Sequence, residues 1–301
     1  MNWLITNNFN IFAKKKIKKM IKKIIHLADI HLRTFKLHKE YSEAFDETIN
    51  QINKLTQDYQ RNEIRIVIAG DYVHQKITIS NELLVIGTKF LKQLEGLAPV
   101  IIISGNHDTL EGNKDRLDSI TPMVNLLSDL DITYYKGESD YHLDDNIVWC
   151  VYSIFDENKS PDIDKARKQY GDDKKYIGLF HGPIVGLKTD LGYEFDHGAD
   201  KEKFSGCDAV LCGDIHKRGG LIYEEPVSEF ETKQIPIIMS GSLIQQNYGE
   251  SINNHGFLVW DVDSLTYEEY DVKTDFGFYL FNIKSLDDIE NDNEILINNK
   301  W

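Results

Sequence analysis

Cysteine is scarce in this chain of 301 residues, which contains only Cys150, Cys207 and Cys212. The three form no CxxC pair and lack the spacing of a zinc finger. A sparse, odd cysteine content is not typical of a disulfide scaffold and favours a reducing cytosol. Long apolar runs are missing too, since no stretch approaches the roughly 20 residues of a membrane span. We therefore expect a cytoplasmic protein that has no membrane-spanning segment and no membrane partner.

A secretory signal is also absent. Residues 1–13 are mixed in polarity and precede seven lysines between Lys14 and Lys23, whereas an export signal places its charges before its apolar region. We expect residues 1–23 to form a basic, disordered leader. The helical spacing of Ile17, Met20, Ile21 and Ile24 leaves open a short basic amphipathic helix that contacts DNA phosphates or a membrane surface.

Basic residues are few for a protein that binds nucleic acid tightly without a partner. The chain has 34 Lys and Arg against 49 Asp and Glu, a net charge of −15, and the leader holds seven of the lysines. Such an acidic balance argues against tight, unassisted DNA binding over a long footprint. It is compatible with an enzyme whose partner supplies the affinity for DNA.

Hydrophobic residues make up 41% of the chain, which is ordinary for a globular protein with a substantial core. Short apolar runs bounded by glycine alternate with helical patterns, and this alternation predicts βαβ units in a largely parallel sheet. The predicted strands are Lys23–Ala28, Ile64–Gly70 and Pro99–Gly105, and the predicted helices are His38–Tyr59, Asn81–Glu95 and Arg116–Leu130.

The later apolar runs are shorter and closer together, which predicts a second, more antiparallel sheet. These runs are Ile147–Ile154, Tyr176–Phe180, Ala209–Cys212, Ile235–Met239, Gly256–Asp261 and Thr266–Tyr270. We place one domain at 24–272. The remaining residues 273–301 form an acidic tail, in which Phe276–Ile283 is predicted as a strand and Asp287–Glu294 is too acidic to pack. The tail is interpreted as the start of an incomplete subdomain.

Polar side chains follow five of the predicted strands. They are Asp29 and His31; Asp71 and His74; Asn106, His107 and Asp108; His181; and Asp214 and His216. Ligands of α/β sheets bind at the carboxyl ends of strands, and the separations along the chain suit successive βαβ crossovers. Each motif alone is common, and a single histidine after a strand more often caps or packs. Five in this order predict a site.

The predicted ligands offer oxygen and nitrogen atoms but no thiolate. Such a set suits divalent Mn, Fe, Zn or Mg, and enough ligands are present for two ions. The sequence therefore predicts a centre that holds two divalent ions.

These motifs resemble the calcineurin-like metallophosphoesterase superfamily from Ile24 to about Tyr270. Within it, GDYVHQK and SGNHD are similar to the SbcD-type DNA double-strand-break-repair nucleases. The segment Ser240–Gln246 (SGSLIQQ) also resembles that family, with Ser240 where proline is usual. Protein Ser/Thr phosphatases have GDYVDRG and RGNHE instead, so His74, Gln75 and Asp108 weigh against that class. The resemblance implies a four-layer αββα sandwich, an α/β fold in which helices flank two mixed β-sheets.

The resemblance also implies the role of each residue. Asp29, His31 and His216 would hold one ion, Asp71 would bridge both, and Asn106, His181 and Asp214 would hold the other. His107 would be the acid near the leaving oxygen, oriented by Asp108, and His74 would position the substrate.

Asp214 departs from the family pattern, which has histidine at this position. A third carboxylate lowers the net positive charge of a two-ion centre. We therefore predict a bridging water with a higher pKa and a preference for Mn²⁺ or Mg²⁺ over softer ions. The alternative is that the shorter carboxylate reaches the metal only through a water.

Basic side chains flank the motifs. Arg33, Lys36, His38, Lys39, Lys217 and Arg218 are candidates for phosphate contact, foremost Arg33, Lys217 and Arg218, although solvated loop charge is an equal alternative for each. His142, His197 and His255 match no motif and are interpreted as surface or capping residues.

The resemblance implies an Mn²⁺-dependent DNA exonuclease and endonuclease, with Mg²⁺ or Fe²⁺ as other possible ions. It also implies homodimerisation and a partner ATPase of the SbcC type, which is SMC-like. A phosphodiesterase or phosphatase for small substrates would use the same residues. A non-catalytic scaffold is the third hypothesis, but every ligand position is filled by a competent residue.

Overall fold

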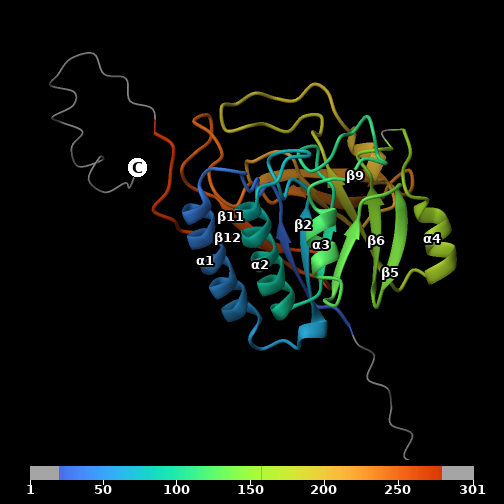
Figure 1. Ribbon diagram of the computed structural model, residues 1–301. Helices are drawn as coiled ribbons and strands as arrows, with labels where there is room; N and C mark the ends of the chain where they lie inside the picture. Colours follow the sequence, from blue (N-terminus) through green and yellow to red (C-terminus); the bar gives the residue numbers. More distant parts are fainter. Residues whose placement is uncertain (1–19, 157, 280–301) are drawn as a thin grey trace, which may run out of the picture.

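Two six-stranded β-sheets pack face to face, and helices cover their outer sides (Figure 1). The computed structural model describes residues 20–156 and 158–279, and the following statements concern these ranges. In spatial order, the first sheet consists of β12 (Tyr267–Asp271), β11 (Gly256–Asp261), β1 (Lys23–Leu27), β2 (Ile64–Ala69), β3 (Val100–Ile103) and β4 (Ile132–Tyr135). Strands β1 to β4 are parallel, whereas β11 and β12 are antiparallel to their neighbours.

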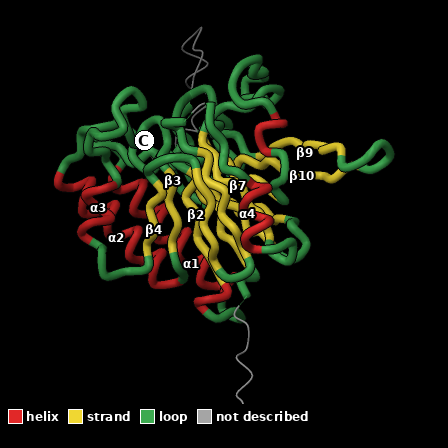
Figure 2. Tube along the Cα trace, turned by 90° about the vertical axis from the view of Figure 1, so that its right-hand side faces the viewer, coloured by secondary structure: helices red, strands yellow, loops and turns green. Residues whose placement is uncertain are grey.

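The second sheet has the same mixture of directions. Its order is β5 (Asp140–Asp144), β6 (Ile147–Tyr152), β7 (Lys175–His181), β8 (Ala209–Gly213), β10 (Thr232–Met239) and β9 (Gly219–Pro226). The strands β6, β7, β8 and β10 are parallel, and each edge strand pairs antiparallel. The β9–β10 hairpin at the edge of the second sheet projects outward from the rest of the chain (Figure 2).

The helices form the two outer layers. They are α1 (His38–Thr56), α2 (Asn81–Leu97), α3 (Thr121–Leu126) and α4 (Ile163–Tyr170), with short 3₁₀ helices η1 (Arg61–Glu63) and η2 (Lys201–Phe204). Figure 2 shows α1–α3 on one side of the strands and α4 on the other. Over the part of the chain that is described, no helix is both long and apolar enough to cross a bilayer.

Three apolar clusters hold the four layers together. One lies between α1, α2 and the first sheet, a second lies between the two sheets, and a third lies between the second sheet and α4. Because central strands are covered on both faces, they are apolar at nearly every position, as in IRIVIA of β2. Successive side chains alternate between clusters: Ile66 and Ile68 face the helices, whereas Val67 faces the other sheet.

A histidine connects the two sheets directly. His26 of β1 is fully buried, and its Nε2 lies 3.1 Å from the carbonyl oxygen of Cys212 in β8. A carbonyl oxygen only accepts, so Nε2 of His26 carries the proton and donates it. Burial, the main cause, lowers the pKa of His26 to about 3, although the bond to Cys212 opposes this shift.

The α/β prediction is confirmed, but the direction of the second sheet was predicted wrongly. Each sheet has three parallel and two antiparallel pairings, so the second is no more antiparallel than the first, and β11 and β12 belong to the first sheet. Apolar periodicity identifies strands but carries no information about which strands pair. The strands β4, β5 and β9 and helix α4 were not predicted, because their polar, half-exposed residues give no continuous apolar run.

The predicted helix Arg116–Leu130 is wrong in length, since α3 covers only Thr121–Leu126. Pro122 favours a helix start at this point, and the Asp118 carboxylate accepts the backbone N–H groups of Ile120 and Thr121. At the amino end, packing extends to Ile21, ahead of the predicted boundary at 24. Residues 276–279 are not a strand, whereas 1–19, most of the leader, and 280–301, most of the tail, lie outside the described residues.

Candidate metal centre

The predicted ligands come together at one end of the two sheets, where loops gather above the strands in Figure 2. Asp29 follows β1, Asp71 follows β2 and Asn106 follows β3, whereas His181 ends β7 and Asp214 follows β8. The carboxyl ends of parallel strands share an edge. The face-to-face packing of the sheets therefore brings two such edges into contact.

Asp71 lies at the middle of the cluster. Its Oδ2 is 3.4 Å from Nε2 of His31, and its Oδ1 is 3.3 Å from Nε2 of His181. Its Oδ1 also accepts the backbone N–H of His107 at 2.8 Å. A carboxylate between two imidazoles has the placement that a bridging ligand requires. Gly105 permits this arrangement, because any Cβ there would clash with the Asp71 carboxylate.

Asp29, His31 and His216 form one half of the centre. Their ligand atoms lie within 4.8 Å of one another, and the Nε2 atoms of the two histidines are 2.9 Å apart. Asp29 is fully buried and accepts the backbone N–H of Asp214 at 3.0 and 3.1 Å on its two oxygens. This bond joins the loop after β1 to the loop after β8.

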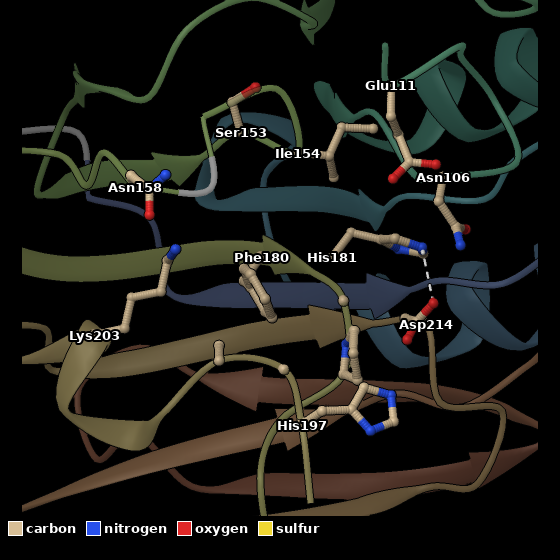
Figure 3. A pocket seen from close by; sticks show the side chains of 14 residues that line it. Asn106, Glu111, Ser153, Ile154, Asn158, Phe180, His181, His197, Lys203 and Asp214 are labelled. Atoms are coloured by element: carbon tan, nitrogen blue, oxygen red, sulfur yellow. Dashed lines mark ion pairs between the residues drawn. The ribbon is translucent and has the colours of Figure 1, made fainter. Parts of the chain in front are cut away.

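Asn106, His181 and Asp214 form the other half, where their side chains converge (Figure 3). Nδ1 of His181 donates to the carbonyl oxygen of Ala69 at 2.8 Å, so Nε2 points toward the centre. It lies 3.8 Å from Oδ1 of Asp214. The ligand atoms of His181, Asp29 and Asp71 lie within 4.8 Å of one another.

A cation fits this set of groups. Oδ1 of Asn106 and Nε2 of His181 are buried and have no hydrogen-bond partner among the described residues. Buried polar atoms without partners are rare in native proteins and call for an explanation such as an ion. The oxygen and nitrogen donors, with no thiolate, suit hard or borderline divalent ions.

The electrostatics of the cluster point the same way. Burial is the main reason that the pKa of Asp29 is raised to about 7; His216 and His181 oppose this shift, whereas the Asp71 and Asp214 carboxylates add to it. Burial alone would lower the pKa of His181, but Asp71, Asp29 and Asp214 hold it well above its usual value. Three crowded carboxylates therefore favour positive charge at this position.

Backbone strain is concentrated at the predicted ligands. Asp29, His31 and Asp71 have φ of 50°, 51° and 52°, and Asp214 has a φ of 100°. Positive φ is uncommon outside glycine and costs of order 1–3 kcal/mol for a sparsely populated conformation. Strain of this kind persists where surrounding contacts fix a functional geometry.

Glu250 is part of the centre and was missed by sequence reasoning. Its Oε1 lies 2.6 Å from Nδ1 of His216, and its side chain is only 8% exposed. Its Oε2 accepts the backbone N–H of Gln246 at 2.7 Å. Carboxylates that bond the far nitrogen of a ligating histidine fix the ring. No motif marks a lone glutamate in a loop, and its position four residues after SGSLIQQ was the only available signal.

The expected role of Asp108 is wrong. Its two oxygens accept the backbone N–H groups of Val73 and Gly105, both at 2.9 Å. Nδ1 of His107 instead donates to the carbonyl oxygen of His74 at 2.9 Å. The backbone of His74 therefore orients the His107 ring, whereas Asp108 fixes the loops that carry Asp71 and Asn106.

His74 and Arg33 act together. Nη1 of Arg33 lies 3.1 Å from Nε2 of His74, and Nη2 donates to the carbonyl oxygen of Gln246 at 3.2 Å. Burial, then the charge of Arg33, lowers the pKa of His74 to about 4, so its ring is neutral and accepts the guanidinium proton. Nδ1 of His74 is 3.2 Å from Nδ1 of His31. Arg33 thus holds His74, which in turn contacts His31, in addition to being a candidate for substrate contact.

Arg218 was predicted wrongly as a phosphate contact. Its side chain is 3% exposed and pairs with Asp271 at 2.8 Å and Glu269 at 3.3 Å on β12. Lys217 is exposed at the rim and remains a candidate. Among the other candidates, His38 bonds the carbonyl oxygen of Arg33 at 2.8 Å, and Lys39 pairs with Glu43.

The three unassigned histidines have different environments. His255 is buried, which contradicts the predicted surface or capping role, and its two nitrogens bond Ser242 and the Ser251 carbonyl at 2.9 and 2.6 Å. His142 is half-buried and stacks on Tyr135. His197 is exposed, as predicted, but it also lines a hollow beside the centre (Figure 3).

Two curated proteins are similar to this chain in sequence. The chain is 36% identical over 267 residues to uncharacterized protein R555 of Acanthamoeba polyphaga mimivirus, covering 87% of this chain and 19% of that protein. It is 29% identical over 164 residues to an uncharacterized metallophosphoesterase of Helicobacter pylori strain 26695, covering 54% of this chain and 38% of the relative. The chain thus spans well under half the length of these two relatives.

Solved structures resemble the chain only distantly. The NAD nucleotidase of Haemophilus influenzae has a TM-score of 0.42 and 14% identity, over 83% of this chain and 49% of that one. The phosphopantetheinyl hydrolase of Mycobacterium tuberculosis has a TM-score of 0.39 and 11% identity, over 75% of this chain and 91% of that one.

The family model for the calcineurin-like phosphoesterases matches residues 22–218, and this range contains each of the seven predicted ligands. Because those ligands converge on one buried, carboxylate-rich centre, sequence and geometry lead to the same assignment. The chain belongs to the calcineurin-like phosphoesterase family, a family of metal-dependent hydrolases.

Proposed function

We propose that this chain hydrolyses phosphodiester bonds in DNA, as a metal-dependent nuclease that resembles the SbcD type. The observation that carries the proposal is the convergence of the seven ligands beside His107. Two divalent ions bound by these ligands, for which we propose Mn²⁺, would supply charge neutralisation and an activated water. The motifs GDYVHQK and SGNHD favour a nuclease over a protein phosphatase.

His107 is placed to move a proton at the edge of the centre. Because its Nδ1 donates to the carbonyl oxygen of His74, Nε2 is the nitrogen that faces the cluster and exchanges a proton. The ring lies 4.8 Å from that of His31 and stacks on that of His74 at 5.0 Å. We propose that Nε2 protonates the leaving oxygen, a role that contributes roughly 10²–10⁴-fold in rate.

Gln75 distinguishes the site from that of a protein phosphatase. Its side-chain oxygen accepts hydrogen bonds from the backbone N–H and the hydroxyl of Thr34. The residue therefore ties the loop after β2 to the loop after β1. An arginine at this position, as in GDYVDRG, has no acceptor atom and could not receive the backbone N–H of Thr34.

The acidic charge of the chain suggests that DNA binding requires a partner. A chain with a net charge of −15 attracts DNA poorly over long range. We propose that an SMC-like ATPase partner of the SbcC type, together with a second copy of the chain, supplies the grip on DNA in the cytoplasm. Salt-dependent DNA binding by the isolated chain, measured against the mixture with such an ATPase, tests this proposal.

The decisive experiment compares three substrates with Mn²⁺: end-labelled duplex DNA, a single-stranded oligonucleotide and bis(p-nitrophenyl) phosphate. We expect cleavage of DNA and its loss in His107→Ala. Hydrolysis of the small ester without any cleavage of DNA would favour the second candidate, a phosphodiesterase for small nucleotides. The nucleotide-sized hollow beside the centre is the observation that favours this alternative. Absence of Mn²⁺ binding by calorimetry would instead support a non-catalytic scaffold.

A further inference from the structure

A hollow of about 520 Å³ opens directly beside the second half of the metal centre (Figure 3). Asn106, His181 and Asp214 form the wall that it shares with the centre. Its other walls come from the loop after β6, from the long loop after β7 and from η2. A single ligand could therefore place its phosphate at the centre and the group attached to that phosphate in the hollow.

We propose that this hollow binds one nucleoside of the substrate, next to the phosphate that is hydrolysed. The inference rests on the proposed function only in placing the phosphate at the metal centre. It applies to a DNA end and to a free nucleotide alike, because both present a base and a sugar attached to phosphorus.

The size of the hollow favours this occupant. Sites for small molecules commonly have volumes of roughly 300–1,000 Å³, and the observed volume lies in that range. A bare phosphate or a short alkyl phosphate would leave most of it filled with water. A base and its sugar together would fill much more of this volume.

Phe180 provides an aromatic surface for a base. The side chain is half-buried, and the rings of Phe204 and Tyr152 pack edge-on against it at 5.2 and 6.5 Å. These neighbours hold the ring in place, which reduces the entropy lost on stacking. Gly182 keeps the ring accessible, because it has a φ of +153° and any Cβ would lie 3.0 Å from the Phe180 ring. Stacking on a fixed aromatic ring is a sequence-tolerant way to bind bases.

The polar lining suits a neutral, hydrogen-bonding ligand. Asn158 and His197 offer donors and acceptors for the edge of a base or for a sugar hydroxyl. Apart from the metal ligands, the charged side chains of the lining are Lys203 and Glu111, which are opposite in sign. The hollow therefore has no excess of positive charge for a second phosphate, and an uncharged nucleoside fits it better.

Calorimetry on the Mn²⁺-loaded full chain tests the proposal. The probes are inorganic phosphate, 2-deoxyribose 5-phosphate, thymidine 5′-monophosphate and deoxyadenosine 5′-monophosphate. We expect both nucleotides to bind about tenfold more tightly than the sugar phosphate, which is the effect of stacking one base. Phe180→Leu should remove most of this advantage and leave phosphate affinity unchanged. Phe230→Leu, at an exposed position of the β9–β10 hairpin, is the matched control. It should change neither the affinity for nucleotides nor the affinity for phosphate.

A second variant guards against a folding defect in Phe180→Leu. Asn158 is exposed, so Asn158→Ala should fold normally, weaken nucleotide binding about threefold and spare phosphate. Equal binding of nucleotides and sugar phosphate, or an equal loss of phosphate and nucleotide binding in both variants, would overturn the proposal.

The outcomes separate this inference from the proposed function. Nucleotide binding with the expected advantage, in a protein that does not cut DNA, would refute the nuclease and leave the nucleoside site standing. Cleavage of DNA by a protein that binds sugar phosphate as tightly as nucleotides would refute the nucleoside site and leave the nuclease standing.

Discussion

Glu250 holds His216 through a 2.6 Å contact between Oε1 and Nδ1, although neither residue lies in a strand or a helix. Because this contact occupies Nδ1, it leaves Nε2 of His216 to face His31 and Asp29. The second carboxylate oxygen bonds the backbone of Gln246. Glu250 thus couples the SGSLIQQ segment to the metal centre.

Replacement of Glu250 should weaken metal binding. We expect Glu250→Ala to lower Mn²⁺ affinity by about 10- to 100-fold, the usual effect of losing a carboxylate behind a ligating histidine. Glu250→Gln, which retains an acceptor, should lose less. Calorimetric titration with Mn²⁺ measures both, and Glu229→Gln on an exposed loop serves as the control. Wild-type affinity in Glu250→Ala would show that the contact is only structural.

Asp214 should set the preference of the centre for hard cations. Its Oδ1 lies 3.8 Å from Nε2 of His181, and a third carboxylate favours oxygen-seeking ions such as Mn²⁺ and Mg²⁺. We expect Asp214→His to raise the ratio of Zn²⁺ to Mg²⁺ affinity at least tenfold in competition titrations. Asp200→His, at an exposed position, controls for the added imidazole. A ratio that stays the same in Asp214→His would rule out the charge argument.

His107 should affect turnover without affecting metal binding. Its side chain bonds the carbonyl oxygen of His74, and its backbone N–H bonds Asp71. We expect His107→Ala to lower kcat by roughly 10²–10⁴-fold while Mn²⁺ affinity stays within about twofold, because the N–H is retained. His142→Ala, which loses a half-buried ring remote from any motif, is the matched control. Loss of Mn²⁺ binding in His107→Ala would instead make His107 a ligand.

His26 should make the fold sensitive to acid. Its pKa is lowered to about 3 by burial, whereas an unfolded histidine titrates near 6.5. Below pH 6.5 the unfolded chain gains a proton that the folded chain does not, so stability falls as the pH decreases toward 3. The slope is about 1.4 kcal/mol per pH unit, or about 2 kcal/mol between pH 6.5 and 5.

Urea unfolding of wild type and His26→Gln at pH 7 and pH 5 isolates this contribution. Glutamine can still donate to the carbonyl oxygen of Cys212 but does not titrate. The loss of stability between the two pH values should be smaller in the variant by about 2 kcal/mol. Equal losses in both proteins would mean that His26 does not titrate differently in the folded chain.

Local sequence determined the buried central strands and the order of the motifs, but not the polar strands β4, β5 and β9. A run such as IRIVIA can satisfy its backbone and bury its side chains only as a central strand. The polar residues that follow each run then lie at the carboxyl end of a strand. Asp29, Asp71, Asn106, His181 and Asp214 could therefore be placed at strand ends from the sequence alone.

Only the tertiary structure decided how those edges meet and what supports the ligands. Face-to-face packing of the sheets brings the N–H of Asp214 to the carboxylate of Asp29, and it places Glu250 behind His216. It also turns Arg218 toward β12 and Asp108 toward two backbone amides. These contacts join residues far apart in the chain, and their geometry depends on pairing and packing that no local pattern encodes.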